Sequence, residues 1–283
     1  MHDREERCRA AEDGSFDVAI IGGGINGACL YDQLCRRGYR VLLVDKGDFA
    51  GGTSQASAMM IWGGLLYLKN LDLRSVYRFS RSRDRMIREM SAWVSPQLFR
   101  FLPATGGVLG KRSVLAALYL YWIIGRFERR RPAIIADLPD AALLSRPAEA
   151  LGFEEAILRT SDSRFVLGWI TPHRAPSGAA LNYTDLTGGG FEAEGGLWRL
   201  HLRDLIAPRD LTAHARVVVN CAGVWTDSVN ETFDIRSSMK HVFSKGVFLG
   251  FRRDPSQVGP MIFEMGDHDD VITSIPWGPV ELW

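Results

Sequence analysis

The chain has 283 residues, of which 46% are hydrophobic and 24% are charged. This length and composition are enough to bury one large core or two moderate ones. The formal net charge of +1 gives no support for a nucleic-acid partner, so none is expected. The cysteines are Cys8, Cys29, Cys35 and Cys221, and no two of them form a Cys-x-x-Cys pair. This spacing favours a reducing compartment, the cytoplasm, and predicts no metal site.

Residues 1–13 read MHDREERCRAAED and contain no apolar run. A secretory signal requires such a run, so this segment does not qualify as one. The sequence therefore predicts a disordered tail ahead of the first strand.

The next stretch, FDVAIIGGGINGACLYDQLCRRGYRVLLVDKGDF, carries the signals of a strand–helix–strand unit in order. Residues 18–21 are apolar, as expected of a strand buried on both faces of a parallel sheet. Apolar residues then recur at helical spacing from Ala28 to Cys35, and Gly38 is well placed to end that helix. Residues 41–44 form a second apolar strand.

Three glycines join the first strand to the helix in the pattern Gly22-x-Gly24-x-x-Gly27. Gly22 permits a tight turn, Gly24 lets the backbone approach a pyrophosphate, and Gly27 lets the helix pack closely on the strand. Asp45 follows Gly27 by 18 residues and can accept hydrogen bonds from the adenosine ribose. An acid rather than an arginine at this position disfavours NADP and leaves NAD or FAD.

The segment FAGGTSQASAMMIWGGLLYL, which starts at Phe49, favours FAD. Its small residues would let the backbone lie along an extended cofactor, with Thr53 and Ser54 donating hydrogen bonds to pyrophosphate or ribityl oxygens. Gly63 and Gly64 would let the chain pass close to a flat ring. These properties suit a flavin.

Several motifs then resemble the FAD-dependent glycerol-3-phosphate dehydrogenases, within the wider D-amino-acid-oxidase-like flavoproteins. They are FDVAIIGGGINGA, VLLVDKGDFAGGTSQAS, IWGGLLYLKNLDLR, TSDSRFVLGWI, RVVVNCAGVWTDSV, SKGVFLGF and ITSIPWGPVELW. They cover most of the chain in the family's order. The resemblance identifies the chain as a member of that family, either divergent or truncated, because members continue well beyond Trp283.

The resemblance implies an α/β fold, with a Rossmann-like FAD-binding domain on a parallel sheet and an interleaved α+β cap domain. We expect residues 14–95 and 151–229 in the FAD-binding domain, and residues 96–150 and 230–283 in the cap. The implied cofactor contacts are Gly22, Gly24, Ile25, Asn26, Gly27, Asp45, Lys46, Gly52, Thr53, Ser54, Trp62, Gly63, Gly64, Leu65, Leu186, Ala222, Gly223 and Trp225.

The implied activity is hydride transfer from a CH–OH carbon of glycerol 3-phosphate, or a related alcohol, to the flavin, with quinone or O₂ as electron acceptor. Two alternatives stay open: an oxidase of amines or 2-hydroxy acids, and a flavin-binding fragment without catalysis. The sequence assigns no catalytic base.

Several positions that are usually polar in the family look apolar here. The family's His-Gly-Gly-Leu-Arg pattern is replaced by one that has Trp62 for the histidine and Leu66 for the arginine. Met59 stands where a lysine is usual, and Val247-Phe248 replaces Ser-His. Because these groups would accept the hydroxyl proton and hold the phosphate, their loss puts glycerol 3-phosphate itself in question. The remaining polar candidates are Arg164, His241 and Lys245.

Two segments bear on whether the chain contacts a membrane. Arg74, Arg78, Arg81, Arg85 and Arg88 fall on one face of a predicted helix. Such a stripe could meet anionic lipid, as the peripheral location implied by the resemblance would require, but a solvated face is favoured. The apolar run at residues 114–124 is too short to span a bilayer, and a buried helix is favoured over a helix that dips into a membrane surface. A homodimer also stays open.

Overall fold

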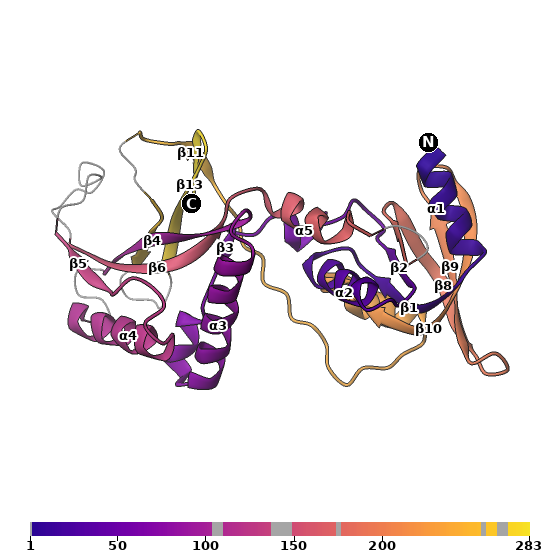
Figure 1. Ribbon diagram of the computed structural model, residues 1–283, viewed down its shortest axis with the longest axis horizontal. Helices are drawn as coiled ribbons and strands as arrows, with labels where there is room; N and C mark the ends of the chain where they lie inside the picture. Colours follow the sequence, from indigo (N-terminus) through magenta and orange to yellow (C-terminus); the bar gives the residue numbers. More distant parts are fainter. Residues whose placement is uncertain (1, 104–109, 137–148, 174–176, 256–258, 265–270) are drawn as a thin grey trace. The chain divides into compact units, whose positions relative to one another are not determined.

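The computed structural model describes residues 2–103, 110–136, 149–173, 177–255, 259–264 and 271–283. The chain divides into two compact units. Unit 1 consists of Met1–Ser57 and Thr160–Ser244, and unit 2 consists of Ala58–Arg159 and Lys245–Trp283. Each unit is formed by two segments that are far apart in the sequence, an earlier one and a later one (Figure 1).

Unit 1 is built on a six-stranded sheet with the strand order β7-β2-β1-β10-β9-β8. The strands β1 (Ser15–Ile21), β2 (Val41–Val44), β7 (Gly178–Leu181) and β10 (Arg209–Asn220) are parallel, whereas β8 (Thr184–Glu192) and β9 (Leu197–Asp204) continue the sheet antiparallel. Helix α2 (Ile25–Arg36) connects β1 to β2. The predicted strand–helix–strand unit is confirmed, since α2 joins two parallel strands whose continuous apolar runs are buried.

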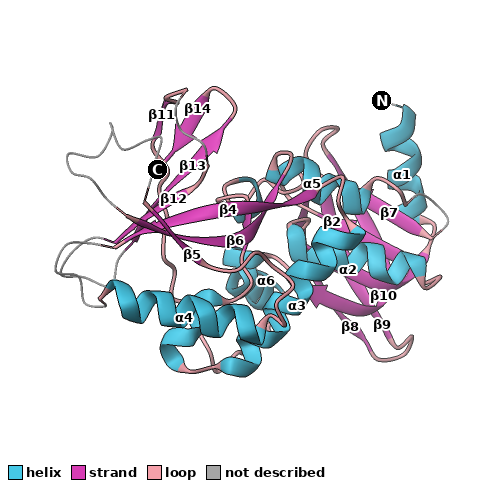
Figure 2. Cartoon of the chain, turned by 60° about the vertical axis from the view of Figure 1, so that its left-hand side comes forward, coloured by secondary structure: helices cyan, strands magenta, loops and turns pink. Residues whose placement is uncertain are grey.

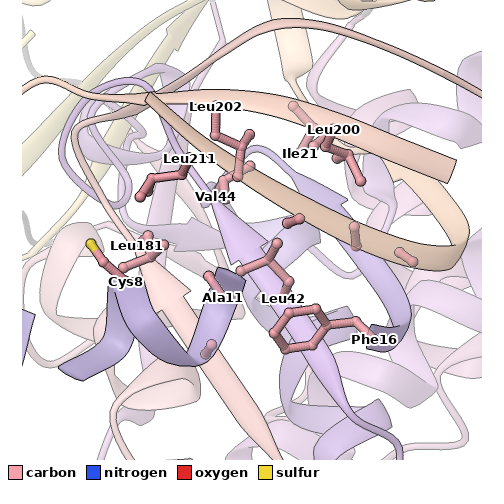
Figure 3. Packing of buried hydrophobic residues seen from close by; sticks show 14 residues of the cluster. Cys8, Ala11, Phe16, Ile21, Leu42, Val44, Leu181, Leu200, Leu202 and Leu211 are labelled. Carbon is pink, nitrogen blue, oxygen red and sulfur yellow. The ribbon is translucent and has the colours of Figure 1, made fainter. Parts of the chain in front are cut away.

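Alternate residues of β1 and β2 contribute to two different hydrophobic clusters, one on each face of the sheet. Ile20 and Leu43 pack with residues of α2 and of α5 (Asp162–Ile170). Ile21 and Leu42 pack on the other face with residues of β9, β10 and helix α1 (His2–Glu12) (Figure 3). The sheet is therefore buried on both sides, as a doubly wound fold requires.

The predicted disordered tail needs correction, because residues His2–Glu12 form helix α1 (Figure 2). Cys8 and Ala11 are fully buried against β7 and β10. Arg4 also pairs with Asp204 at 2.7 Å. Charged residues dominate this helix, and its stability comes from two buried side chains and one distant ion pair, which local composition does not reveal.

Unit 2 contains a sheet with the order β11-β14-β13-β12-β4-β6-β3, to which β5 adds beside β6. Its strands are β3 (Met60–Ile61), β4 (Val94–Leu102), β5 (Ala133–Ile135), β6 (Ala150–Leu158), β11 (Gly250–Arg252), β12 (Met261–Glu264), β13 (Val271–Trp277) and β14 (Val280–Leu282). Helices α3 (Leu73–Glu89) and α4 (Lys111–Ile124) belong to this unit. The expected burial of α4 holds for one face only: Leu118 is buried and Ile123 is 51% exposed.

The boundaries of the two units differ from the domain boundaries expected from the sequence. Residues 58–95 and 151–159 were expected in the FAD-binding domain and lie in unit 2. The reason is strand pairing, because β6 pairs with β3 and with β4 along its length. Residues 230–244, expected in the cap, lie in unit 1.

Unit 2 contains a buried ionic cluster centred on Arg83. Its guanidinium contacts Glu155 at 2.9 Å and Asp84 at 3.0 Å, and all three side chains are at most 2% exposed. The Tyr121 hydroxyl donates to Glu155 as well, and burial beside this carboxylate raises the pKa of Tyr121 well above its usual value. The phenol therefore stays protonated and remains a donor.

The predicted arginine stripe lies on α3, and acids neutralise part of it. Arg81 and Arg88 both pair with Glu128, and Arg85 pairs with Glu89. No described helix combines the length and the apolar character that crossing a bilayer demands. These ion pairs fit the favoured reading of the stripe as a solvated face.

Replacing Glu155 by Gln removes the buried charge opposite Arg83. We expect the free energy of unfolding in urea to fall by roughly 3 kcal/mol, because a buried guanidinium loses one of its two carboxylates. Glu89→Gln is the control, since it removes an exposed partner of Arg85 and is expected to change stability by less than about 0.5 kcal/mol. Equal losses of unfolding free energy in the two variants would contradict the assignment of Glu155 as the buried charge partner of Arg83.

Asp204 makes the stability of unit 1 depend on pH. Burial alone raises the pKa of this carboxyl, but hydrogen bonds from Arg4 and from the N–H groups of Ile206 and Ala207 outweigh burial and lower the pKa to about 2. A depressed folded-state pKa stabilises the fold above the unfolded pKa of about 4, and this stability is lost as pH falls toward 2. Asp204→Asn should therefore flatten the unfolding-temperature curve between about pH 4 and pH 2. An unchanged slope would refute the linkage.

Candidate cofactor-binding site

The turn after β1 is possible only because two of its residues lack a side chain. Gly22 has φ +107°, and a Cβ atom there would lie 2.4 Å from the Cys221 carbonyl oxygen. A Cβ on Gly27 would lie 1.9 Å from the Gly22 carbonyl oxygen. The first turn of α2 therefore packs directly on the end of β1, with no space for a methyl group.

Asp45, at the end of β2, holds this turn in place. Its Oδ2 accepts from the Gly23 N–H at 2.6 Å, and its Oδ1 accepts from the Gly47 N–H at 2.8 Å. The carboxylate thus ties the glycine turn to β2. An ionised carboxylate has about four acceptor sites, so capacity remains for ligand hydroxyls.

The N-terminus of α2 faces the same space. Gly24 is the N-cap residue and offers no side-chain acceptor to the free N–H groups of the first turn. Ser54, in the short helix η1 (Thr53–Gln55), accepts from the Ile25 N–H at 3.0 Å. Helix N-termini of this kind bind phosphate, because their N–H groups and the helix dipole favour negative charge.

Lys46 and Trp225 form a cation–π pair on the lining of this space. The Lys46 ammonium lies 4.1 Å from the centre of the Trp225 ring, and the ring lies close against Gly52, where a Cβ would be 3.0 Å away. Trp225 ends the short helix η4 (Gly223–Trp225). This cation–π pair places a positive charge on the lining of the space that the α2 N-terminus also faces.

Asn220 shapes the loop that carries Ala222 and Gly223. Its side-chain amide donates to the Thr226 carbonyl and to Asn230, each at 2.9 Å, and its Oδ1 accepts from the Ala222 N–H at 3.1 Å. The residue thus links the end of β10 to α6 (Thr226–Thr232).

These features enclose one cavity of about 510 Å³ within unit 1. Ligand pockets typically have volumes of about 300–1,000 Å³. Most of the predicted contacts line it: Gly22, Gly24, Ile25, Asn26, Asp45, Lys46, Gly52, Thr53, Ser54, Leu186, Ala222, Gly223 and Trp225. The structure therefore brings together residues from the ends of β1, β2 and β10, as the switch point of a doubly wound sheet predicts.

Five predicted contacts lie elsewhere. Gly27 is buried beneath the turn, where it packs against Gly22. Trp62, Gly63, Gly64 and Leu65 belong to unit 2. There the Gly63 N–H donates to Glu155 at 3.0 Å and its carbonyl accepts from the Ser80 hydroxyl at 2.9 Å, so Glu155 of the buried cluster and Ser80 together hold Gly63 in place.

Further residues line the cavity without having been predicted, among them Asp48, Thr184, Asp185, Cys221, Ser228 and Thr232. Cys221 directly follows β10, and this position could have indicated it, whereas Thr184 and Asp185 begin β8 and Ser228 and Thr232 lie in α6. Burial raises the pKa of the Cys221 thiol, so it stays protonated at neutral pH.

The three remaining polar candidates do not gather at this cavity. His241 contacts Asp227 at 2.9 Å, and its hydrogen bonds lower the pKa of that carboxyl. The Arg164 backbone N–H donates to Ser161 at the start of α5. Lys245 opens the second segment of unit 2. No described residue is thereby assigned as a catalytic base.

A parallel crossover with a glycine turn, a helix N-terminus and a strand-end carboxylate around one cavity defines a dinucleotide-binding unit of the doubly wound class. The sequence matches the family of FAD dependent oxidoreductases (DAO) over residues 17–280. The chain belongs to this family, which confirms the family and the fold class predicted from sequence.

Curated relatives include the aerobic glycerol-3-phosphate dehydrogenase of Staphylococcus saprophyticus, which is 26% identical over 96% of this chain and 50% of its own length. The alpha-glycerophosphate oxidase of Enterococcus casseliflavus is 27% identical over 94% of this chain and 45% of its own length. The chain thus spans about half the length of these relatives.

Among solved structures, the glycerol-3-phosphate dehydrogenase of Bacillus halodurans, complexed with FAD, has a TM-score of 0.69 at 21% identity. The match covers 99% of this chain and 49% of that one. Glycine oxidase of Geobacillus kaustophilus has a TM-score of 0.59 at 16% identity, over 95% and 70% of the two chains. At these identities the likeness shows the shared fold.

Gly27→Ala should disrupt the site, because its methyl group would overlap the Gly22 carbonyl oxygen. We expect the unfolding temperature to fall and binding of AMP, the adenosine half of a dinucleotide, to weaken at least tenfold as α2 is pushed off β1. Gly190→Ala is the control, because nothing lies within 4 Å of a Cβ there. Unchanged AMP binding in Gly27→Ala would contradict this geometry.

Proposed function

We propose that the chain binds FAD in the cavity of unit 1 and acts in the cytoplasm as an FAD-dependent oxidoreductase on the CH–OH group of glycerol 3-phosphate or a related alcohol. One observation carries the proposal. The glycine turn, the α2 N-terminus and Asp45 converge on one cavity in a chain that matches the FAD dependent oxidoreductases over residues 17–280.

The residues present suit the AMP half of FAD. The N–H groups at the start of α2 would receive the pyrophosphate, close to the Ser54 hydroxyl and the Lys46 ammonium. Asp45 would accept hydrogen bonds from the ribose hydroxyls. Leu186 and Thr184, at the start of β8, would border the adenine. Gly22 and Gly24 leave room for the pyrophosphate that larger residues would take.

The chemistry that FAD supplies when bound is to accept a hydride, that is two electrons and a proton, from a carbon that bears a hydroxyl group. The carbon becomes a carbonyl, and the hydroxyl proton must pass to a base. The contribution of unit 1 is to bind and orient the cofactor. Its fixed amides and the Lys46 charge offset the negative pyrophosphate.

A second candidate activity has support of its own in the residues of unit 2. Trp62 packs against Phe99 in an apolar cluster, and Leu66 is a 58% exposed apolar side chain where the family usually has an arginine. An oxidase acting on amines or 2-hydroxy acids would not need a phosphate-binding cation at this position.

The proposed electron acceptors are O₂ or a quinone. A membrane quinone would require contact with a lipid surface, for which the arginine stripe of α3 is the candidate, although Glu128 and Glu89 offset part of its charge. Peripheral membrane contact and homodimer formation are further parts of the proposal. Co-sedimentation with anionic vesicles and light scattering would measure them.

The test is to purify the 283-residue chain, add FAD, remove excess cofactor and record the visible spectrum. A retained flavin spectrum supports FAD binding, and a colourless protein overturns it. The holoprotein is then mixed anaerobically with glycerol 3-phosphate, glycine or lactate. Bleaching by glycerol 3-phosphate supports the leading activity, whereas bleaching only by glycine or lactate favours the second candidate. A flavin that none of them bleaches indicates binding without catalysis.

A further inference from the structure

The Arg4 side chain, in helix α1, donates hydrogen bonds to several residues that are distant from it in the sequence. Its guanidinium donates to Asp204 at 2.7 Å, to the Asn182 carbonyl oxygen at 2.9 Å and to the Asn182 side chain at 3.2 Å. It also donates to the Tyr183 carbonyl and to the Thr184 hydroxyl, each at 3.3 Å. One side chain therefore binds a carboxylate and three consecutive residues of a turn.

The last residue of that turn lies at the cavity. The Thr184 N–H donates to the Asp45 carbonyl oxygen at 2.8 Å, and the Tyr183 N–H donates to the Gly47 carbonyl oxygen at 2.8 Å. Thr184 itself lines the cavity. The turn is thus bonded on one side to Arg4 and on the other to the segment that carries the ribose-binding carboxylate.

The conformation of the turn depends on such outside contacts. Tyr183 has φ +47°, which places a bulky residue in the left-handed region. This conformation costs about 1 kcal/mol or more and persists where the surroundings hold it. The Asn182 side chain adds a hydrogen bond to Asp48, another cavity residue, at 2.9 Å.

The arrangement is built into the interior. Asp204 is 1% exposed and Arg4 is 17% exposed. Because Cys8 and Ala11 of the same helix are buried, the helix, and with it the Arg4 backbone, is held against the sheet. A planar guanidinium can bind a carboxylate with one edge and carbonyl oxygens with another, which a lysine ammonium cannot do from one position.

We propose that Arg4 is a positioning residue for the adenosine end of the cofactor cavity, acting through the turn Asn182–Thr184. This inference rests on the proposed function, because it assumes that the cavity receives a dinucleotide. Arg4 does not line the cavity, so its effect on ligand binding is transmitted through the turn.

The test uses the full chain with Arg4→Lys, Arg4→Gln and the control Arg9→Gln, an exposed arginine on the same helix. AMP and FAD binding are measured by titration calorimetry, and unfolding temperatures without ligand are recorded in parallel. Arg4→Lys keeps the pair with Asp204 but loses the bonds to the turn. We expect about tenfold weaker AMP binding in Arg4→Lys, because the bonds that hold the turn are lost, and a smaller fall in unfolding temperature than in Arg4→Gln, because the pair with Asp204 is kept.

Amide hydrogen exchange of residues 182–186 supplies a second readout that does not depend on a ligand. Faster exchange there in Arg4→Lys, with Arg9→Gln like the wild type, supports the positioning role. Wild-type AMP affinity in Arg4→Lys overturns it, even if FAD binds normally. If the wild-type chain binds neither AMP nor FAD, the proposed function fails and this inference fails with it.

Discussion

The contact between Gly27 and the Gly22 carbonyl is the constraint on which the cofactor cavity depends. It brings the first turn of α2 within van der Waals distance of the end of β1. In that position the N–H groups of α2, the Asp45 carboxylate and the loop after β10 face the same space. Larger residues at either glycine would separate these elements, so the chemistry of the cavity follows from the absence of two methyl groups.

Local signals were sufficient to predict this part of the protein. The apolar runs of β1 and β2, the three glycines and Asp45 lie within thirty residues, and each signal reports on neighbours in the chain. The structure places almost all of the predicted contacts of unit 1 along one cavity. Gly27 is the exception, and its role is to pack the helix rather than to touch a ligand.

Long-range partners explain what could not be predicted. Helix α1 has a charged sequence with little apolar character, and it is held by an arginine that pairs with an aspartate 200 residues away. The division of the chain into units likewise depends on the pairing of β3, only two residues long, with β6. Side-chain periodicity carries no information about such partners. The same limit applies to Arg83, whose two carboxylates come from its neighbour in α3 and from a distant strand.

Strand β10 connects the two halves of the unit 1 sheet in a way that bears on its dynamics. Its first half pairs with β9 and its second half with β1, and it runs directly into Asn220 and the cavity loop. A single uninterrupted strand therefore transmits any fraying of the β8–β9 hairpin to the crossover that shapes the cavity. The antiparallel hairpin and the parallel core should open together as one cooperative segment, so amides on both sides of β10 would share a common opening free energy.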